Sequence, residues 1–301
     1  MANFTAQDVK DLRERTGVGM MECKKALAEA DGDVDKAIDI LRERGEAKAV
    51  SKGSRVAADG IVHAIAKDDI GVVLEVNSET DFVAKNQEFR DFVEQVSTVI
   101  ADKDPTDVTE LLTLDFGDGR TVDEALKEKI LKIGENLKIR RFHRSSGKKV
   151  STYIHGGGSI GVMVEFDTDC AEKPGFDAFA KDIALQVAAA SPQYLDRSEV
   201  EADTLDKERE ILLAQAMNEG KPANIAEKMV EGRLKKYYSE NCLLEQPFVK
   251  DDKVSVGEYI EAEAKKFGGR IVVTGFVRYE KGEGIEKEEG DFAAEVAKMV
   301  K

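Results

Sequence analysis

The chain contains few side chains whose type and spacing suggest chemistry. Its three histidines, His63, His143 and His155, do not stand at metal-binding spacing with one another or with a cysteine. The carboxylates are scattered along the chain, and no pair of them suggests an acid and a base acting together. Without a nucleophile or a metal site, the sequence predicts a protein that is not an enzyme and that holds no metal and no cofactor.

A glycine-rich run, His155-Gly156-Gly157-Gly158-Ser159, has the composition of a phosphate-binding loop but not its context. Such loops join a strand to a helix, often with a GxxxxGK[ST] pattern. This run lies between two expected strands, at 150–154 and 160–166, so a hairpin turn is favoured. His155 would then be exposed at a strand end, where it either contacts a partner or is an ordinary loop residue.

One segment has residue types that suit binding. Residues 77–85 (NSETDFVAK) begin with turn formers and place Asp81 and Phe82 in a polar loop. An aromatic side chain in such a loop either folds back into the core or anchors another protein. The residues alone leave both alternatives open.

Composition limits the partners and the compartment. The chain has 301 residues and a net charge of −15, and an acidic chain repels nucleic-acid backbones, so no direct nucleic-acid partner is expected. Three widely separated cysteines, Cys23, Cys170 and Cys242, favour free thiols in a reducing compartment. The chain begins without a signal peptide, and no apolar run is long enough to span a membrane. We therefore expect a cytoplasmic protein with no membrane partner.

The pattern of residues 1–55 predicts a small domain of three helices followed by a linker. The second helix is expected from about residue 20 to residue 30, with Met21 among its inward positions. The third helix is expected to end at Gly45, because glycine commonly follows a helix. Residues 45–58 would then form a linker or a frayed helix.

The body of the chain contains an internal repeat. The run IGVVLEV from Ile70 and the run IGVMVEF from Ile160 each follow a strand and a turn, and each leads to a helix with an apolar stripe. The repeat predicts two related α+β halves, 56–143 and 144–282, made of antiparallel sheets with helices packed on them. A strand at 270–279 is expected to extend the second sheet.

Two further helical elements are expected outside the repeat. A helical hairpin at about 199–240 either projects as an interface or packs as an ordinary surface pair. Residues 283–301 predict a C-terminal helical module whose apolar side includes Phe292, and which folds back on the body or binds a partner.

Six segments together resemble the elongation factor Ts family, and they fall in the order expected of it. They are Arg15–Leu27 (RTGVGMMECKKAL), Thr80–Lys85 (TDFVAK), Ile133–Arg141 (IGENLKIRR), Lys221–Lys236 (KPANIAEKMVEGRLKK), Gln246–Val249 (QPFV) and Thr274–Lys287 (TGFVRYEKGEGIEK). Together they are spread over nearly the whole chain, from Arg15 to Lys287, whereas residues 101–120 match no motif.

The resemblance implies a function that the residues alone do not. It implies a guanine nucleotide exchange factor that binds elongation factor Tu in its GDP form, promotes GDP release during translation elongation, and inserts the Asp81-Phe82 loop near the partner's magnesium and phosphate site. It implies a ubiquitin-associated-like fold for the N-terminal helices, and dimer contacts through the hairpin. The implied partner-binding residues are Thr80, Asp81, Phe82, Val83, Leu12, Met20, Met21, His155, Gly156 and Phe292.

An adaptor whose function resides in residues 1–44 alone is the alternative. Deleting those residues separates the two hypotheses. An adaptor would lose all binding, whereas an exchange factor should keep some activity through Phe82.

Overall fold

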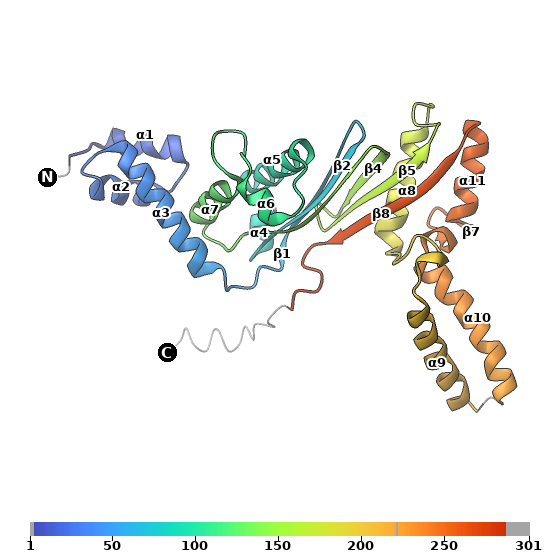
Figure 1. Cartoon of the computed structure of the whole chain (residues 1–301). Coiled ribbons are helices and arrows are strands. Elements are labelled where there is room, and N and C mark those ends of the chain that lie inside the picture. Colours follow the sequence, from blue (N-terminus) through green and yellow to red (C-terminus); the bar gives the residue numbers. More distant parts are fainter. Residues whose placement is uncertain (1–2, 221, 287–301) are drawn as a thin grey trace.

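The computed structural model describes residues 3–220 and 222–286. Figure 1 shows a small helical unit at one end, two sheets with their helices in the middle, and a helical hairpin at the other end. This is the expected α+β fold, with N-terminal helices followed by a body of antiparallel sheets. The chain turns at residues 281–284, and the rest of the expected C-terminal helix, with Phe292, lies outside the described residues.

Three helices form the N-terminal unit. Thr5 and Asp8 make a reciprocal capping box at the start of the first helix, and Gly17 ends that helix in the left-handed conformation. The apolar faces of the three helices meet in one small core. The helices are α1 (Ala6–Thr16), α2 (Met20–Glu29) and α3 (Val34–Lys52).

Two expectations for this unit were wrong. Helix α3 does not end at Gly45 but continues to Lys52. A Cβ at Gly45 would lie 3.4 Å from the Lys127 carbonyl oxygen, so the missing side chain lets α3 pack closely on α7 (Val122–Ile133). Met21 does not face inward either, because its side chain is 63% exposed.

The first half of the body is a three-stranded antiparallel sheet in the order β1-β2-β3. Long apolar side chains of helices α5 and α7 fill the core beneath it, including the expected stripe of Phe89, Phe92, Val93 and Val96. A very short helix, α4, follows the second strand directly. The elements are β1 (Asp59–Lys67), β2 (Ile70–Ser78), α4 (Asp81–Ala84), α5 (Gln87–Lys103), α6 (Val108–Thr113) and β3 (Lys138–Ser146).

The second half repeats this plan with the order β4-β5-β8, and its last strand confirms the expected extension of the sheet. Its core contains the second expected stripe, from Phe176 to Val187 on α8. The elements are β4 (Lys149–His155), β5 (Ile160–Thr168), α8 (Phe176–Ala190), β6 (Pro247–Phe248), β7 (Asp251–Ser255), α11 (Val256–Phe267) and β8 (Ile271–Glu280).

The two sheets pack face to face through a cluster that takes side chains from both. Gly71 of β2 lies against Met163 of the second sheet, and Gly161 of β5 lies against Val62 of the first. A Cβ at either glycine would overlap the facing side chain, so both positions need glycine for the sheets to approach. The buried members of the cluster are Val62, Ala64, Val73, Val150 and Met163.

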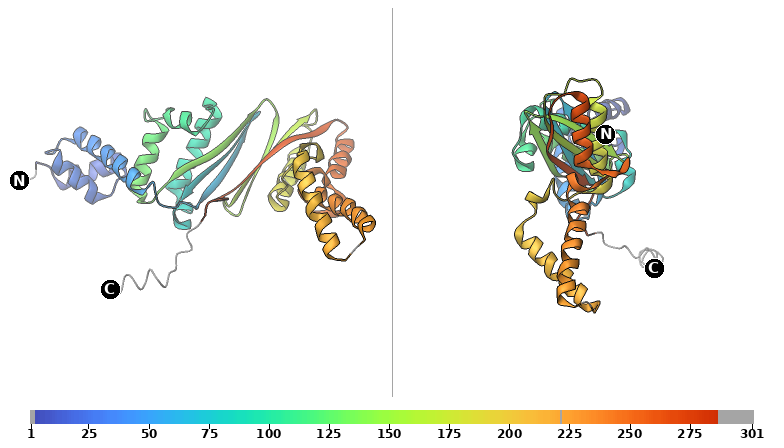
Figure 2. Two further views of the ribbon diagram at one scale, coloured as in Figure 1. Left: turned by 60° about the horizontal axis from the view of Figure 1, so that its bottom comes forward. Right: turned by 90° about the vertical axis from the view of Figure 1, so that its right-hand side faces the viewer.

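The hairpin of α9 (Ala202–Asn218) and α10 (Ala223–Asn241) projects from the body, as the two views in Figure 2 show. The buried side chains of the arms include a narrow apolar seam of Leu212, Val230 and Leu234, together with Ala216 and Ala226. Ile211 and Met217 are more than half exposed. No helix in the described ranges is long and apolar enough to cross a bilayer.

Candidate functional site

The turn after β2 displays one aromatic side chain to solvent. Helix α4 has four residues, and its Val83 and Ala84 are buried in the first core. Phe82, between the buried Val83 and the half-buried Asp81, is 80% exposed. Of the two alternatives for this aromatic, folding back into the core is therefore not the one observed.

Charged groups flank the exposed ring. The Lys85 ammonium donates a hydrogen bond of 2.6 Å to Asp81 Oδ2 and lies 6.0 Å from the centre of the Phe82 ring. That hydrogen bond lowers the pKa of Asp81, so the carboxylate is ionised at neutral pH. The turn thus presents an apolar ring beside an ionised carboxylate that is paired with an ammonium group.

The turn is fastened to the loop between α7 and β3 by two acidic side chains that point in opposite directions. The Glu135 carboxylate accepts hydrogen bonds from the Thr80 N–H, at 3.0 Å, and from the Thr80 hydroxyl, at 2.6 Å. In return, the Glu79 carboxylate accepts a bond of 2.5 Å from the Asn136 N–H. Glu135 and Asn136 belong to a motif quoted above, but the sequence analysis gave them no role because their partners are more than 50 residues away.

A buried carboxylate holds the end of β8 near the same turn. Glu75 has no exposed surface and accepts hydrogen bonds from Arg140, Arg141 and the Gly282 N–H. Burial by itself raises the pKa of Glu75, but these bonds and one from Asn77 outweigh it and hold the pKa below its usual value. The chain therefore leaves β8 at a fixed place beside the first sheet.

The glycine-rich run forms the expected hairpin turn between β4 and β5. His155 and Gly156 are exposed, and the Tyr153 hydroxyl lies 3.2 Å from His155 Nδ1. The far side of the turn is bound to the first half, because the Gly158 carbonyl accepts a hydrogen bond from the Val62 N–H. The turn is thus exposed at its tip and rigid at its base.

The N-terminal unit contributes two exposed methionines. Met20 and Met21 begin α2 and are 51% and 63% exposed. Leu12, in contrast, has no exposed surface and belongs to the core beneath them, as Val83 does beneath Phe82. The expected partner-binding residues among those described therefore lie in three separate regions, the N-terminal unit, the turn after β2 and the turn after β4, and the buried ones support the exposed ones.

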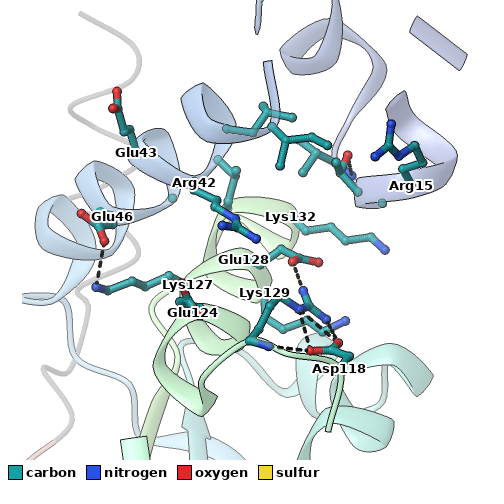
Figure 3. Close-up of a pocket in the computed structure, with 18 of the residues that line it drawn as sticks. Arg15, Arg42, Glu43, Glu46, Asp118, Glu124, Lys127, Glu128, Lys129 and Lys132 are labelled. Atoms are coloured by element: carbon teal, nitrogen blue, oxygen red, sulfur yellow. Dashed lines mark hydrogen bonds and ion pairs between the residues drawn. The ribbon is translucent and has the colours of Figure 1, made fainter. Parts of the chain in front are cut away.

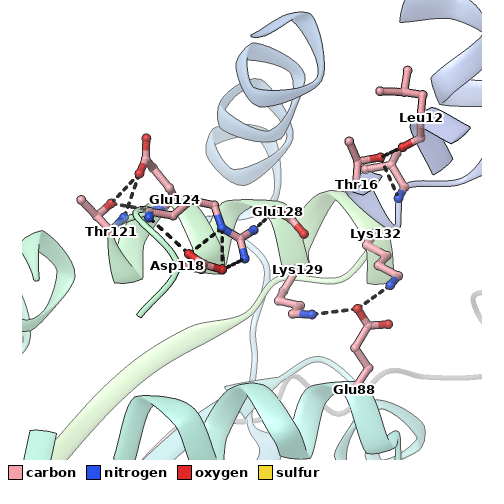
Figure 4. A network of polar contacts seen from close by, with 11 residues as sticks. Leu12, Thr16, Glu88, Asp118, Thr121, Glu124, Glu128, Lys129 and Lys132 are labelled. Atoms are coloured by element: carbon pink, nitrogen blue, oxygen red, sulfur yellow. Dashed lines mark hydrogen bonds and ion pairs between the residues drawn. The ribbon is translucent and has the colours of Figure 1, made fainter. Parts of the chain in front are cut away.

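A hollow of about 670 Å³ lies between the N-terminal unit and α7 (Figure 3). Most of its charged side chains are already paired with one another. Figure 4 shows Glu88 between Lys129 and Lys132, whose ammonium groups lie 2.7 and 2.5 Å from it. We interpret the hollow as the seam along which the N-terminal unit docks on the body, rather than as a ligand site.

The described part of the chain contains no group of three histidine, cysteine or acidic side chains that could hold a metal ion. Its three cysteines are free and buried. Phe82 is the aromatic member of the exposed large apolar side chains in the described residues, and such a ring suits binding.

Comparison with known proteins gives one consistent result. Residues 79–283 match the family model described as Elongation factor TS. The chain is 50% identical over 300 residues to Elongation factor Ts of Clostridium perfringens (strain SM101 / Type A), covering 98% of this chain and 99% of that protein. It is 50% identical over 304 residues to Elongation factor Ts of Clostridioides difficile (strain 630), covering 100% of both chains.

Proposed function

Because the chain belongs to the elongation factor Ts family, we propose that it is a guanine nucleotide exchange factor for elongation factor Tu. In this role it binds the GDP form of that partner in the cytoplasm and speeds the release of GDP, so that GTP can enter. The chain itself holds no nucleotide and performs no covalent step.

The observation that carries the proposal is the exposure of Phe82. A large apolar ring that is 80% exposed on an anchored turn gains nothing for the fold, but it is well suited to fill a pocket on another protein. Because Val83 and Ala84 are buried and Thr80 is hydrogen-bonded, the backbone that carries the ring is held in one orientation. Such preorganisation reduces the entropy that is lost on binding.

In the proposed mechanism, Asp81 and Phe82 enter the partner near its magnesium and phosphate site. The ring fills a pocket that is open only in the nucleotide-free state, and the ionised Asp81 adds negative charge next to anionic phosphates. A factor that binds nucleotide-free Tu more tightly than GDP-bound Tu must lower the affinity for GDP by the same ratio.

We assign further contacts to Met20, Met21, His155 and Gly156, whose exposed positions allow them to touch a partner directly. Since Leu12 and Val83 are buried, we assign them a supporting role and not a contact. A contact through Phe292 remains a prediction that concerns residues outside those described.

The test is the release of a fluorescent GDP analogue from elongation factor Tu, with this protein at substoichiometric amounts. Faster release, with several turnovers for each molecule of factor, supports the exchange function. If release is not accelerated although both proteins are folded, the exchange function is excluded and the adaptor hypothesis becomes the better one.

The projecting hairpin is proposed as the site of contacts between two copies of the chain. It exposes Ile211, Met217 and Ile225, three apolar side chains that the body does not cover. Sedimentation over a range of concentrations tests this. A monomer at all concentrations, or a dimer that survives replacement of these side chains by serine, would contradict the proposed contact.

A further inference from the structure

The internal repeat supplies a control for deciding which contacts around Phe82 serve the fold. Val76 pairs with Ile139 in the first sheet, and Phe166 pairs with Val273 in the second. Both sheets also have a register shift just before these pairs, between Glu75 and Val76 and between Glu165 and Phe166. The strands can therefore be matched residue by residue.

Two hydrogen-bonded clamps hold the turn, one through Glu79 and the other through Glu135. The Glu79 clamp is present in both halves. Three residues beyond the matched pairs, Glu79 corresponds to Asp169 and Asn136 corresponds to Arg270. The Glu79 carboxylate accepts a 2.5 Å bond from the Asn136 N–H, and Asp169 accepts a 2.7 Å bond from the Arg270 N–H. Because the second half has this bond without displaying an aromatic side chain, the bond serves the shared fold.

The other clamp occurs in the first half only. By the same correspondence, Glu135 matches Gly269 and Thr80 matches Cys170. Gly269 has no side chain, and a Cβ there would clash with the Asp169 carboxylate and the Cys170 sulfur. The second half thus closes the same corner without an equivalent of Glu135, so the fold does not require the bonds between Glu135 and Thr80.

Those bonds act directly on the element that carries Phe82. A helix of four residues is not stable by itself, so α4 takes its orientation from its contacts. Thr80 is its N-cap residue, yet the Thr80 side chain makes no capping bond, and its hydroxyl donates to Glu135 instead. Ser78 adds a bond of 2.9 Å to the Thr80 carbonyl, so this residue is held from three sides.

We propose that Glu135 is a positioning residue that fixes the Asp81–Phe82 turn in its binding orientation before the partner arrives. The effect of Glu135 on GDP release rests on the proposed exchange function, whereas its effect on the orientation of the turn does not. Loss of the carboxylate leaves the turn free to sample other orientations, and the protein must then order the turn at the moment of binding.

The geometry can be tested without the partner, because the chain contains no tryptophan. Phe82→Trp introduces a single indole at the tip of the turn, and its fluorescence anisotropy decay reports local motion. Adding Glu135→Gln should produce a larger fast-decaying component. The control is Asp169→Asn, which weakens the second-half equivalent of the Glu79 bond and should leave the indole signal unchanged.

The effect of Glu135 on exchange is tested by measuring GDP release at increasing concentrations of elongation factor Tu·GDP. With native Phe82, Glu135→Gln should raise the half-saturating concentration about tenfold and leave the maximal rate within about twofold. Asp169→Asn should behave as the original chain. The melting temperature of each variant is measured beside the kinetics.

The outcomes separate the two proposals. Unchanged anisotropy and an unchanged half-saturating concentration in Glu135→Gln would overturn the positioning role. If the original chain does not accelerate GDP release at all, the proposed function fails, while the anisotropy comparison still decides whether Glu135 orders the turn.

Discussion

The Glu75 carboxylate, which has no contact with solvent, lies 2.6 Å from Nε of Arg141, in the neighbouring strand of the first sheet. Arg140 lies 3.0 Å from the other carboxylate oxygen, which also accepts a hydrogen bond from the Gly282 N–H. A single buried acid therefore joins β2, β3 and the end of β8.

Glu75→Gln should destabilise the protein by about 3 kcal/mol at pH 7, because it leaves partly buried guanidinium groups without their charged partner. The folded-state pKa of Glu75 is depressed, so its contribution is complete above the unfolded value near 4.5 and is lost as the pH falls through the folded value. The difference in unfolding free energy between the two proteins should therefore shrink below about pH 4.5. Glu261→Gln, at an exposed position of α11, is the control and should show little difference at any pH.

Phe82→Ala should weaken exchange strongly without weakening the fold. Truncation of an anchoring aromatic costs about 2 kcal/mol or more of binding, which corresponds to a roughly 30-fold higher half-saturating concentration in GDP release. Because the ring is 80% exposed, the unfolding free energy should change by less than about 0.5 kcal/mol. Val249→Ala removes a 46% exposed apolar side chain of the second half and should leave both quantities unchanged. A large drop in stability of Phe82→Ala would instead identify the ring as a packing residue.

Gly161→Ala should destabilise the protein by about 1–3 kcal/mol, because the added methyl group overlaps Val62 at the contact between the sheets. Gly232 provides a control of opposite sign. It lies within α10 with open space around it, so Gly232→Ala should stabilise that helix by about 0.5–1 kcal/mol. Denaturant unfolding followed by circular dichroism measures both. An unchanged midpoint for Gly161→Ala would show that the contact with Val62 adjusts to the methyl group without loss of unfolding free energy, which would contradict the prediction.

Deletion of residues 1–44 should reduce exchange but not abolish it. The deletion removes the exposed Met20 and Met21, but it leaves Phe82 and the part of α3 that lies on α7 from Gly45 onward. A titration of GDP release should therefore show a higher half-saturating concentration with acceleration still present. Complete loss of binding to elongation factor Tu would favour the adaptor hypothesis.

Much of the fold follows from local patterns in the sequence. The repeat at Ile70 and Ile160 predicted both sheets, and the apolar stripes predicted the helices beneath them, because period and turn chemistry are local properties. Helices α7 and α11 were not anticipated, although each begins with a capping box, at Thr121 and Ser255, that the sequence displays.

The wrong predictions for Gly45 and Met21 have one cause: tertiary contacts decided both positions, and the local sequence does not show such contacts. Gly45 has the local character of a helix end, but its role depends on the backbone of α7, more than 80 residues away. Met21 fits the apolar face of its helix by composition, yet the three-helix core is already filled by Cys23, Ala26 and Leu27. The sequence identified the turn at Phe82, whereas Glu135 could not be found, because nothing near it in the chain indicates Thr80 as its partner.

The close approach of the sheets has a consequence for the origin of the chain. Gly71 and Gly161 are equivalent residues of the repeat, and each faces the half that contains the other. Contacts of this reciprocal kind are the mark of an isologous, two-fold interface, as found in homodimers. A polypeptide comprising one half alone would leave this face uncovered and should pair with a second copy of itself, so the body has the form of a symmetric dimer joined into one chain.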